Sequence, residues 1–130
     1  MKIFDNENNL LGYLIKIDDF PDGKKFLTEN NNEFQVATFT MEENEIIKRH
    51  IHNKYKRKVF TTSEAITVIE GTLEVEIYDL NKSYLNTFNL NAGDTIVMIA
   101  GGHGLKATKN TKFIEIKQGP YDQEKDKFHF

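Results

Sequence analysis

The stretch EAITVIEGTLEVEIY, residues 64–78, has the pattern of two β-strands joined by a tight turn. In residues 72–78, apolar side chains alternate with glutamates, as in an antiparallel strand with one face on a core and the other in water. The first strand runs into Gly71, which can adopt the positive φ that a tight hairpin turn requires. The stretch therefore predicts a half-buried β-hairpin.

Glu64 opens this stretch in phase with two apolar residues, Ile66 and Val68. Side chains two apart on a strand point to the same face, so the phase directs the Glu64 carboxylate toward the interior. A carboxylate in such a place needs a cation or several hydrogen-bond donors as partners.

The rest of the chain shows the same kind of structure. About ten short segments rich in β-branched and aromatic residues are separated by turn residues, and no segment has the pattern of an amphipathic helix. This pattern predicts an all-β protein, and 130 residues suit a single domain over residues 1–130.

Composition narrows the function classes. The chain has no cysteine, which rules out disulfides and thiolate chemistry, and its net charge of −3 argues against a general nucleic-acid role. No apolar run has the length of a signal peptide or of a membrane span. We therefore expect a cytoplasmic protein that binds neither nucleic acid nor membrane.

Three histidines and a glutamate have spacings that suggest a shared site. His50 and His52 lie two apart in a predicted strand, residues 45–52, so both rings are expected on one face. Glu64 follows, and His103 comes from a distant Gly-rich segment, residues 101–104. Three imidazoles and a carboxylate together would bind a divalent metal ion.

These motifs resemble those of the cupins. The chain has His50-x-His52, then Glu64-x6-Gly71, and then a second motif, residues 93–103, that runs from Gly-Asp to Gly-Gly-His. It departs from the family pattern in the eleven residues between His52 and Glu64. The resemblance implies a double-stranded β-helix, or jelly roll, with core motifs over about residues 45–105. It also implies a homodimer, because small cupins often pair by sheet extension and exposed sheet edges need protection.

The resemblance also implies the metal ligands, which would be His50, His52, Glu64 and His103. This donor set suits Fe, Mn, Ni, Co or Zn. Four protein ligands leave two positions open on an octahedral ion, which could act as a Lewis acid or activate O₂. The hypotheses are a metal-dependent isomerase or epimerase, a metal-dependent dioxygenase, and a non-catalytic sugar- or anion-binding or sensor module. Metal-free sugar epimerases of this fold, which use a histidine with an acidic partner, remain a further possibility.

The chain contains one strongly basic stretch. No acidic residue occurs from Ile46 to Ser63, and we call residues 46–60 the basic segment. Such a loop can be ordinary solvated surface, or it can bind an anion such as a nucleotide sugar. Residues 117–121, KQGPY, resemble a segment of small cupins associated with polysaccharide biosynthesis. The candidate anion-binding residues are Arg49, Lys54, Lys56 and Arg57.

Overall fold

The computed structural model describes all residues, 1–130, and the protein is all-β, with 41% of its residues in strands and 2% in helix. The single helix is a 3-10 turn, η1 (Ile17–Asp19), and no helix has the length and apolar character needed to span a membrane. The strands are β1 (Lys2–Phe4), β2 (Leu10–Ile15), β3 (Lys24–Phe26), β4 (Ala37–Phe39), β5 (Glu64–Glu70), β6 (Thr72–Tyr78), β7 (Tyr84–Asn91), β8 (Thr95–Met98), β9 (Gly102–Ala107) and β10 (Lys112–Lys117).

The chain forms two compact units, which are described separately. The first unit contains residues 1–19 and 61–130, and the second unit contains residues 20–60. The first unit holds eight of the ten strands, and β3 and β4 belong to the second.

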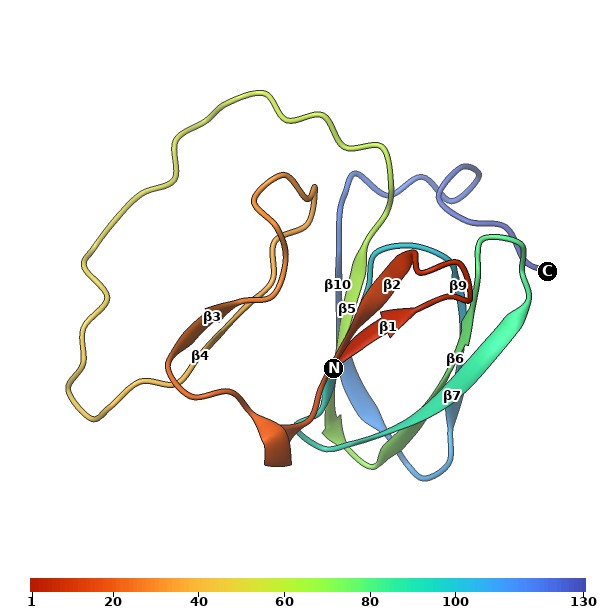
Figure 1. Cartoon of the computed structure of the whole chain (residues 1–130), viewed down its shortest axis with the longest axis horizontal. Helices are drawn as coiled ribbons and strands as arrows, with labels where there is room; N and C mark the ends of the chain where they lie inside the picture. Colours follow the sequence, from red (N-terminus) through yellow and green to blue (C-terminus); the bar gives the residue numbers. More distant parts are fainter. The chain divides into compact units, whose positions relative to one another are not determined.

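Two antiparallel sheets face each other in the first unit (Figure 1). The five-stranded sheet has the order β1-β2-β8-β5-β10, and the three-stranded sheet has the order β7-β6-β9. One apolar cluster lies between them, with Ile66 and Val68 from the first sheet and Leu73 and Val75 from the second all at most 1% exposed. The first unit is therefore a sandwich, and β9 and β10 are edge strands of its two sheets.

The β5–β6 hairpin is the structure that its alternating sequence predicts. Leu73, Val75 and Ile77 are buried, and Gly71 in the turn has a φ of +85°. The turn lies against the loop before β10, where a Cβ at Gly71 would collide with the carbonyl oxygen of Asn110 and would lie 2.7 Å from Thr111 Oγ1.

Replacing Gly71 with alanine is expected to lower the free energy of unfolding by about 2–4 kcal/mol. The left-handed backbone costs alanine about 1–2 kcal/mol, and overpacking against the loop costs about 1–3 kcal/mol more. Urea unfolding, followed by circular dichroism, measures the loss. Gly23→Ala is the matched control, since Gly23 also has a positive φ of +66° but has nothing within 4 Å of the added Cβ. Equal losses in the two variants would mean that contact with the loop contributes nothing.

The second unit is small and has little interior. Its strands β3 and β4 pair antiparallel, with Lys24 opposite Phe39 and Phe26 opposite Ala37. The fully buried side chains are polar, Thr28 and Thr38, and every hydrophobic residue of the molecular core belongs to the first unit.

Two of the expected elements differ from the structure. The strand expected over residues 45–52 does not form, and the histidine contact there is local, with His50 Nδ1 2.9 Å from the Lys48 carbonyl oxygen. The apolar residues in this segment favour a strand, but a strand also needs a neighbour to supply hydrogen bonds. Conversely, residues 102–107 form strand β9, although they include part of the Gly-rich segment, residues 101–104, and glycine disfavours strands.

Candidate functional site

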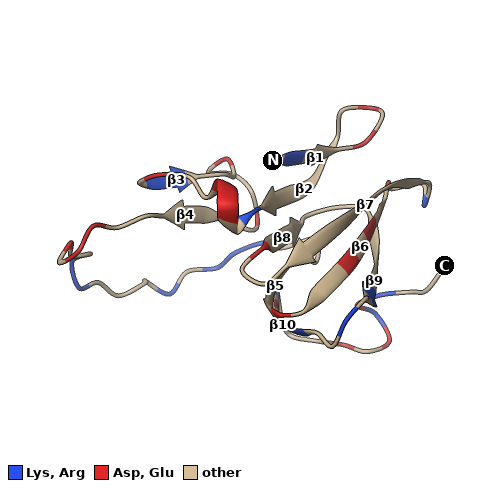
Figure 2. Ribbon diagram, turned by 90° about the horizontal axis from the view of Figure 1, so that it is seen from below, with Lys and Arg blue, Asp and Glu red and all other residues tan.

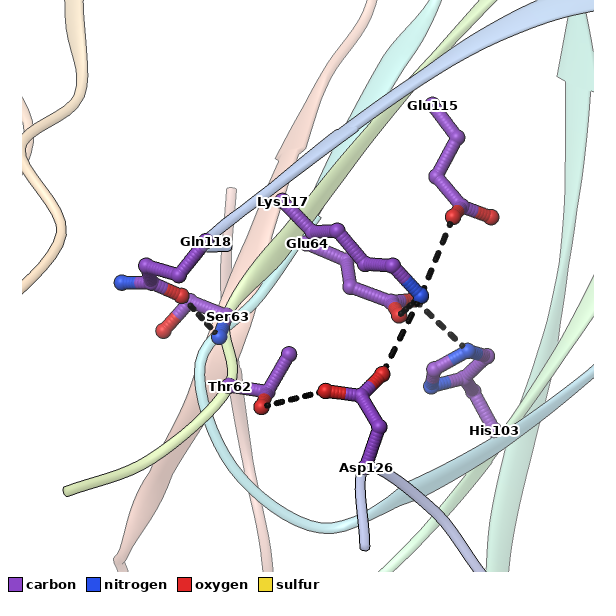
Figure 3. A network of polar contacts seen from close by, with 8 residues as sticks. All are labelled: Thr62, Ser63, Glu64, His103, Glu115, Lys117, Gln118 and Asp126. Carbon is purple, nitrogen blue, oxygen red and sulfur yellow. Dashed lines mark hydrogen bonds and ion pairs between the residues drawn. The ribbon is translucent and has the colours of Figure 1, made fainter. Parts of the chain in front are cut away.

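Glu64 and His103 are brought together in the first unit. Glu64 begins β5, and His103 lies on β9 of the opposite sheet, where it pairs with Ile77 of β6. The distance from His103 Nε2 to Glu64 Oε2 is 3.1 Å, and both side chains are largely shielded from solvent (Figure 3). As its strand phase predicts, the Glu64 carboxylate points inward and has found polar partners.

Lys117 supplies the cation beside this carboxylate. It lies at the end of β10 directly opposite Glu64 in the strand register, and its Nζ is 3.6 Å from Glu64 Oε1. The same ammonium lies 3.5 Å from Glu115 Oε1 and 3.2 Å from Asp126 Oδ2 (Figure 3). Three carboxylates thus surround one lysine, and one of them, Glu64, also contacts the His103 imidazole.

The pKa values of this network follow from its contacts. The hydrogen bond with His103 lowers the pKa of Glu64. Burial raises this pKa, but the electrostatic interactions with His103 and Lys117 lower it further. The net shift is downward, so Glu64 is ionised at neutral pH. Burial lowers the pKa of Lys117, but the carboxylates of Asp126, Glu64 and Glu115 outweigh burial and raise it overall. The network therefore keeps an ionised carboxylate beside the His103 ring and an ammonium beside that carboxylate.

This network lies at the wall of a cavity of 830 Å³ whose lining includes Glu64, His103 and Asp126. That volume lies within the range of about 300–1,000 Å³ usual for small-molecule sites. Aromatic rings form another part of the lining, and the rings of Tyr78 and Phe130 meet edge to face at 5.2 Å between centroids.

The charge of this wall favours some ligand groups over others. Three carboxylates face one ammonium, so the wall has excess negative charge. Carboxylates accept hydrogen bonds from hydroxyl groups and repel phosphates. The wall therefore suits a hydroxyl-rich, uncharged portion of a ligand.

The other two predicted metal ligands lie in the second unit. The His50 and His52 rings are exposed, with centroids 5.1 Å apart, and His50 lines a separate cavity of 770 Å³ together with Asp22, Phe39 and Glu45. Within either unit, no three His, Asp or Glu side chains gather in an arrangement that could hold a metal ion. The four-ligand metal site draws on both units and stays a prediction.

The cations of the basic segment are solvent-exposed. Figure 2 marks the Lys and Arg positions in blue along the ribbon. The Arg57 guanidinium lies over the Tyr55 ring, with 3.9 Å between Arg57 Cζ and the ring centroid, which is the geometry of a cation–π interaction. The candidate anion-binding residues, all exposed and all in the second unit, are Arg49, Lys54, Lys56 and Arg57.

Lys117 and Asp126 were not identified from the sequence. The inward phase of Glu64 predicts a partner cation, but the pairing of β10 with β5 selects Lys117 from the many lysines of the chain. Asp126 lies in the C-terminal tail, residues 122–130, which is mostly polar. This carboxylate contacts Lys117, and Phe128 and Phe130 of the same tail line the cavity.

Comparison with known proteins gives no match to a protein-family model, a curated protein or a solved structure. The relationship to the cupins therefore stays a prediction from the motifs.

Proposed function

We propose that this protein is an isomerase or epimerase that acts on the sugar portion of a small anionic metabolite, such as a nucleotide sugar. The observation that carries the proposal is the Glu64–His103 pair, 3.1 Å apart, at the wall of a cavity of small-molecule size. A histidine held by a carboxylate is a common arrangement for general acid–base catalysis.

The proposed reaction is a proton transfer next to a carbonyl group. Neutral His103 removes a proton from the carbon beside the carbonyl, and the electron pair of that C–H bond moves onto the carbonyl oxygen to give an enediolate. Glu64 orients the ring and stabilises the imidazolium that forms. Return of the proton to the former carbonyl carbon gives an isomer when the hydroxyl proton also moves from one enediolate oxygen to the other. Return of the proton to the opposite face of the original carbon gives an epimer.

The lining of the cavity bears on which part of a substrate it would bind. Its acidic wall suits the hydroxyl groups of a sugar. Tyr78 and the tail residues Phe128 and Phe130 supply the aromatic surface common in small-molecule pockets.

Metal dependence is the second candidate, and the adjacency of two predicted ligands, Glu64 and His103, favours it. The residues of the first unit do not fit a resident metal by themselves. They provide two adjacent donors, and the Lys117 ammonium already lies 3.6 Å from Glu64 Oε1, where a divalent ion would meet strong repulsion. We therefore assign no step of the reaction to a metal.

Elemental analysis of the purified protein separates the two candidates. The metal-free reaction predicts a turnover that survives treatment with chelator and a metal content well below one ion per chain. One ion per chain, lost in both His52→Ala and His103→Ala together with thermal stability, would establish the four-ligand site and overturn the metal-free reaction.

Removing two cations of the basic segment is expected to weaken pyrophosphate binding tenfold or more at low salt. Charge-assisted hydrogen bonds contribute about 1.5–3 kcal/mol each, and salt screening is least under these conditions. Calorimetric titration of wild type and of Lys56→Ala/Arg57→Ala measures the difference. Lys24→Ala/Lys25→Ala removes the same charge elsewhere in the second unit and serves as control. Equal affinities in all three proteins would leave the basic segment as ordinary surface.

A further inference from the structure

The C-terminal tail is held to the first unit by side chains and not by strand pairing. Residues 122–130 contain no strand, and their backbone hydrogen bonds are local, from the N–H groups of Lys125 and Asp126 to the Asp122 carbonyl oxygen at 3.1 and 2.9 Å. No tail residue belongs to the apolar core between the two sheets. Segments with few buried apolar contacts open locally while the rest of a protein stays folded.

An ion pair anchors the middle of the tail. Asp126 Oδ2 lies 3.2 Å from Lys117 Nζ, and Asp126 Oδ1 lies 3.5 Å from Thr62 Oγ1 (Figure 3). The Asp126 side chain is 10% exposed, whereas every other residue of the tail is exposed. We call the Asp126–Lys117 pair the latch, because it joins the tail to the last strand of the sandwich.

Two phenylalanines add further anchors. The Phe130 ring meets the Tyr78 ring edge to face, with 5.2 Å between centroids, and lies against Gly102. The Lys82 ammonium lies 4.8 Å from the centroid of the Phe128 ring, within the range of a cation–π interaction. Phe128 is nevertheless 70% exposed and Phe130 is 61% exposed. These contacts place the tail but bury little of its apolar surface.

The tail forms one wall of the cavity that contains the Glu64–His103 pair. All residues from Lys125 to Phe130 line this cavity. A ligand that fills the cavity would cover part of the exposed surface of Phe128 and Phe130, so it would bind the docked tail better than the undocked tail. A ligand shifts a conformational equilibrium by its difference in affinity for the two states.

We propose that the C-terminal tail is a lid over the cavity. The undocked tail lets a ligand enter and leave, and the tail docked on the latch and on Tyr78 closes the cavity around it. Closure of a lid excludes water from the enclosed groups, which here include His103. The lid follows from the contacts of the tail, and only the nature of the enclosed ligand, a sugar, rests on the proposed function.

Double electron–electron resonance tests whether the tail docks and undocks. The chain has no cysteine, so Asn110→Cys/Glu124→Cys places one nitroxide label in the loop before β10 and one on the tail. We expect a docked and an undocked distance between the labels. Adding Asp126→Asn and Phe130→Ala is expected to lower the docked population at least threefold, because it removes both anchors.

Glu115→Gln in the same labelled chain is the matched control for the latch. It removes another carboxylate from Lys117, at 3.5 Å, but leaves the contacts of the tail intact, so the docked population should stay the same. A loss as large as that of the Asp126→Asn/Phe130→Ala chain would contradict the role of the latch. A distance distribution that is the same in all three labelled chains would overturn the lid.

Modification with diethyl pyrocarbonate then tests whether the tail controls access to the cavity. The reagent reacts with histidine rings, and mass spectrometry follows its rate at His103, whose side chain is 29% exposed. Phe130→Ala leaves the charge of the site unchanged and is expected to raise this rate at least threefold. The exposed rings of His50 and His52, in the second unit, should react equally fast in both proteins.

Both experiments use the protein without ligand. A protein that opens and closes its tail but converts no sugar would therefore keep the lid and lose the proposed reaction. An unchanged rate at His103 in Phe130→Ala would show that the tail does not gate the cavity, and the proposal would be wrong even if turnover were found.

Discussion

Replacing Asp94 with alanine is expected to lower the free energy of unfolding by about 2–4 kcal/mol. The Asp94 side chain is buried, and its carboxylate lies 2.7 Å from Lys16 Nζ. It also accepts hydrogen bonds from the backbone N–H groups of Ile17 at 3.0 Å and Asn91 at 2.8 Å. Alanine would leave all three donors without this acceptor, and each unpaired buried group costs about 1–3 kcal/mol, with a discount for the partly exposed lysine.

The loss should also depend on pH. Burial raises the pKa of Asp94, but hydrogen bonds from Lys16, Asn91 and Ile17 and the lysine charge outweigh it, so the folded pKa lies below the ordinary 3.8. The stabilisation is therefore fully present above about pH 4 and fades as the pH falls through the folded pKa. Chemical unfolding of wild type and Asp94→Ala at pH 7 and pH 3 should show the difference narrowing at the lower pH.

An exposed ion pair provides the control for Asp94. Lys112 Nζ lies 2.6 Å from Glu70 Oε2, but both side chains are more than half exposed. Exposed pairs contribute about 0–1 kcal/mol, so Glu70→Ala should change the stability little. A loss as large as that of Asp94→Ala would show that burial does not account for the effect.

Replacing His103 with glutamine is expected to lower the turnover of a converted sugar by a factor of about 10²–10⁴, the usual contribution of general acid–base catalysis. Glutamine keeps polar atoms near Glu64 but cannot carry the proton. The affinity for the same sugar, measured by calorimetry, should change much less than the turnover. Steady-state rates followed by NMR provide the measurement.

His129 provides the matched histidine control. It lines the same cavity, but it is exposed and has no ion pair with a carboxylate. His129→Gln should therefore keep nearly full turnover. A comparable loss of turnover in His129→Gln and His103→Gln would show that the Glu64–His103 pair has no special role in the reaction. Sugar binding without turnover in wild type would support the binding-module hypothesis.

The parts of the fold that were predicted correctly depend on local patterns. The alternation in β6 and the glycine at position 71 specify a hairpin without reference to distant residues, and both expectations are confirmed. The inward phase of Glu64 likewise indicated a buried carboxylate with a polar partner. Its partners, Lys117 and His103, come from β10 and β9, and sheet order at such separations is not encoded in a local pattern.

The errors have physical causes of the same kind. Isoleucines give residues 45–52 a strand-like pattern. However, β propensity reflects how well a side chain packs against neighbouring strands, and these residues pair with no strand in the structure. Strand β9 was missed because Gly102 and Gly104 disfavour a strand by themselves. Here Gly102 lies against Phe130, and a Cβ at this position would lie 2.8 Å from the Phe130 ring, which would have to shift.

The proton-transfer function is tested most directly by NMR in D₂O. Wild type and His103→Gln are incubated with a panel of nucleotide-linked keto-sugars, and loss of the proton signal beside the carbonyl is followed. We predict that wild type exchanges this proton for deuterium in at least one sugar, and that His103→Gln exchanges it at least a hundredfold more slowly. Equal exchange rates in the two proteins, or no exchange in any sugar that binds in the cavity, would contradict the assignment.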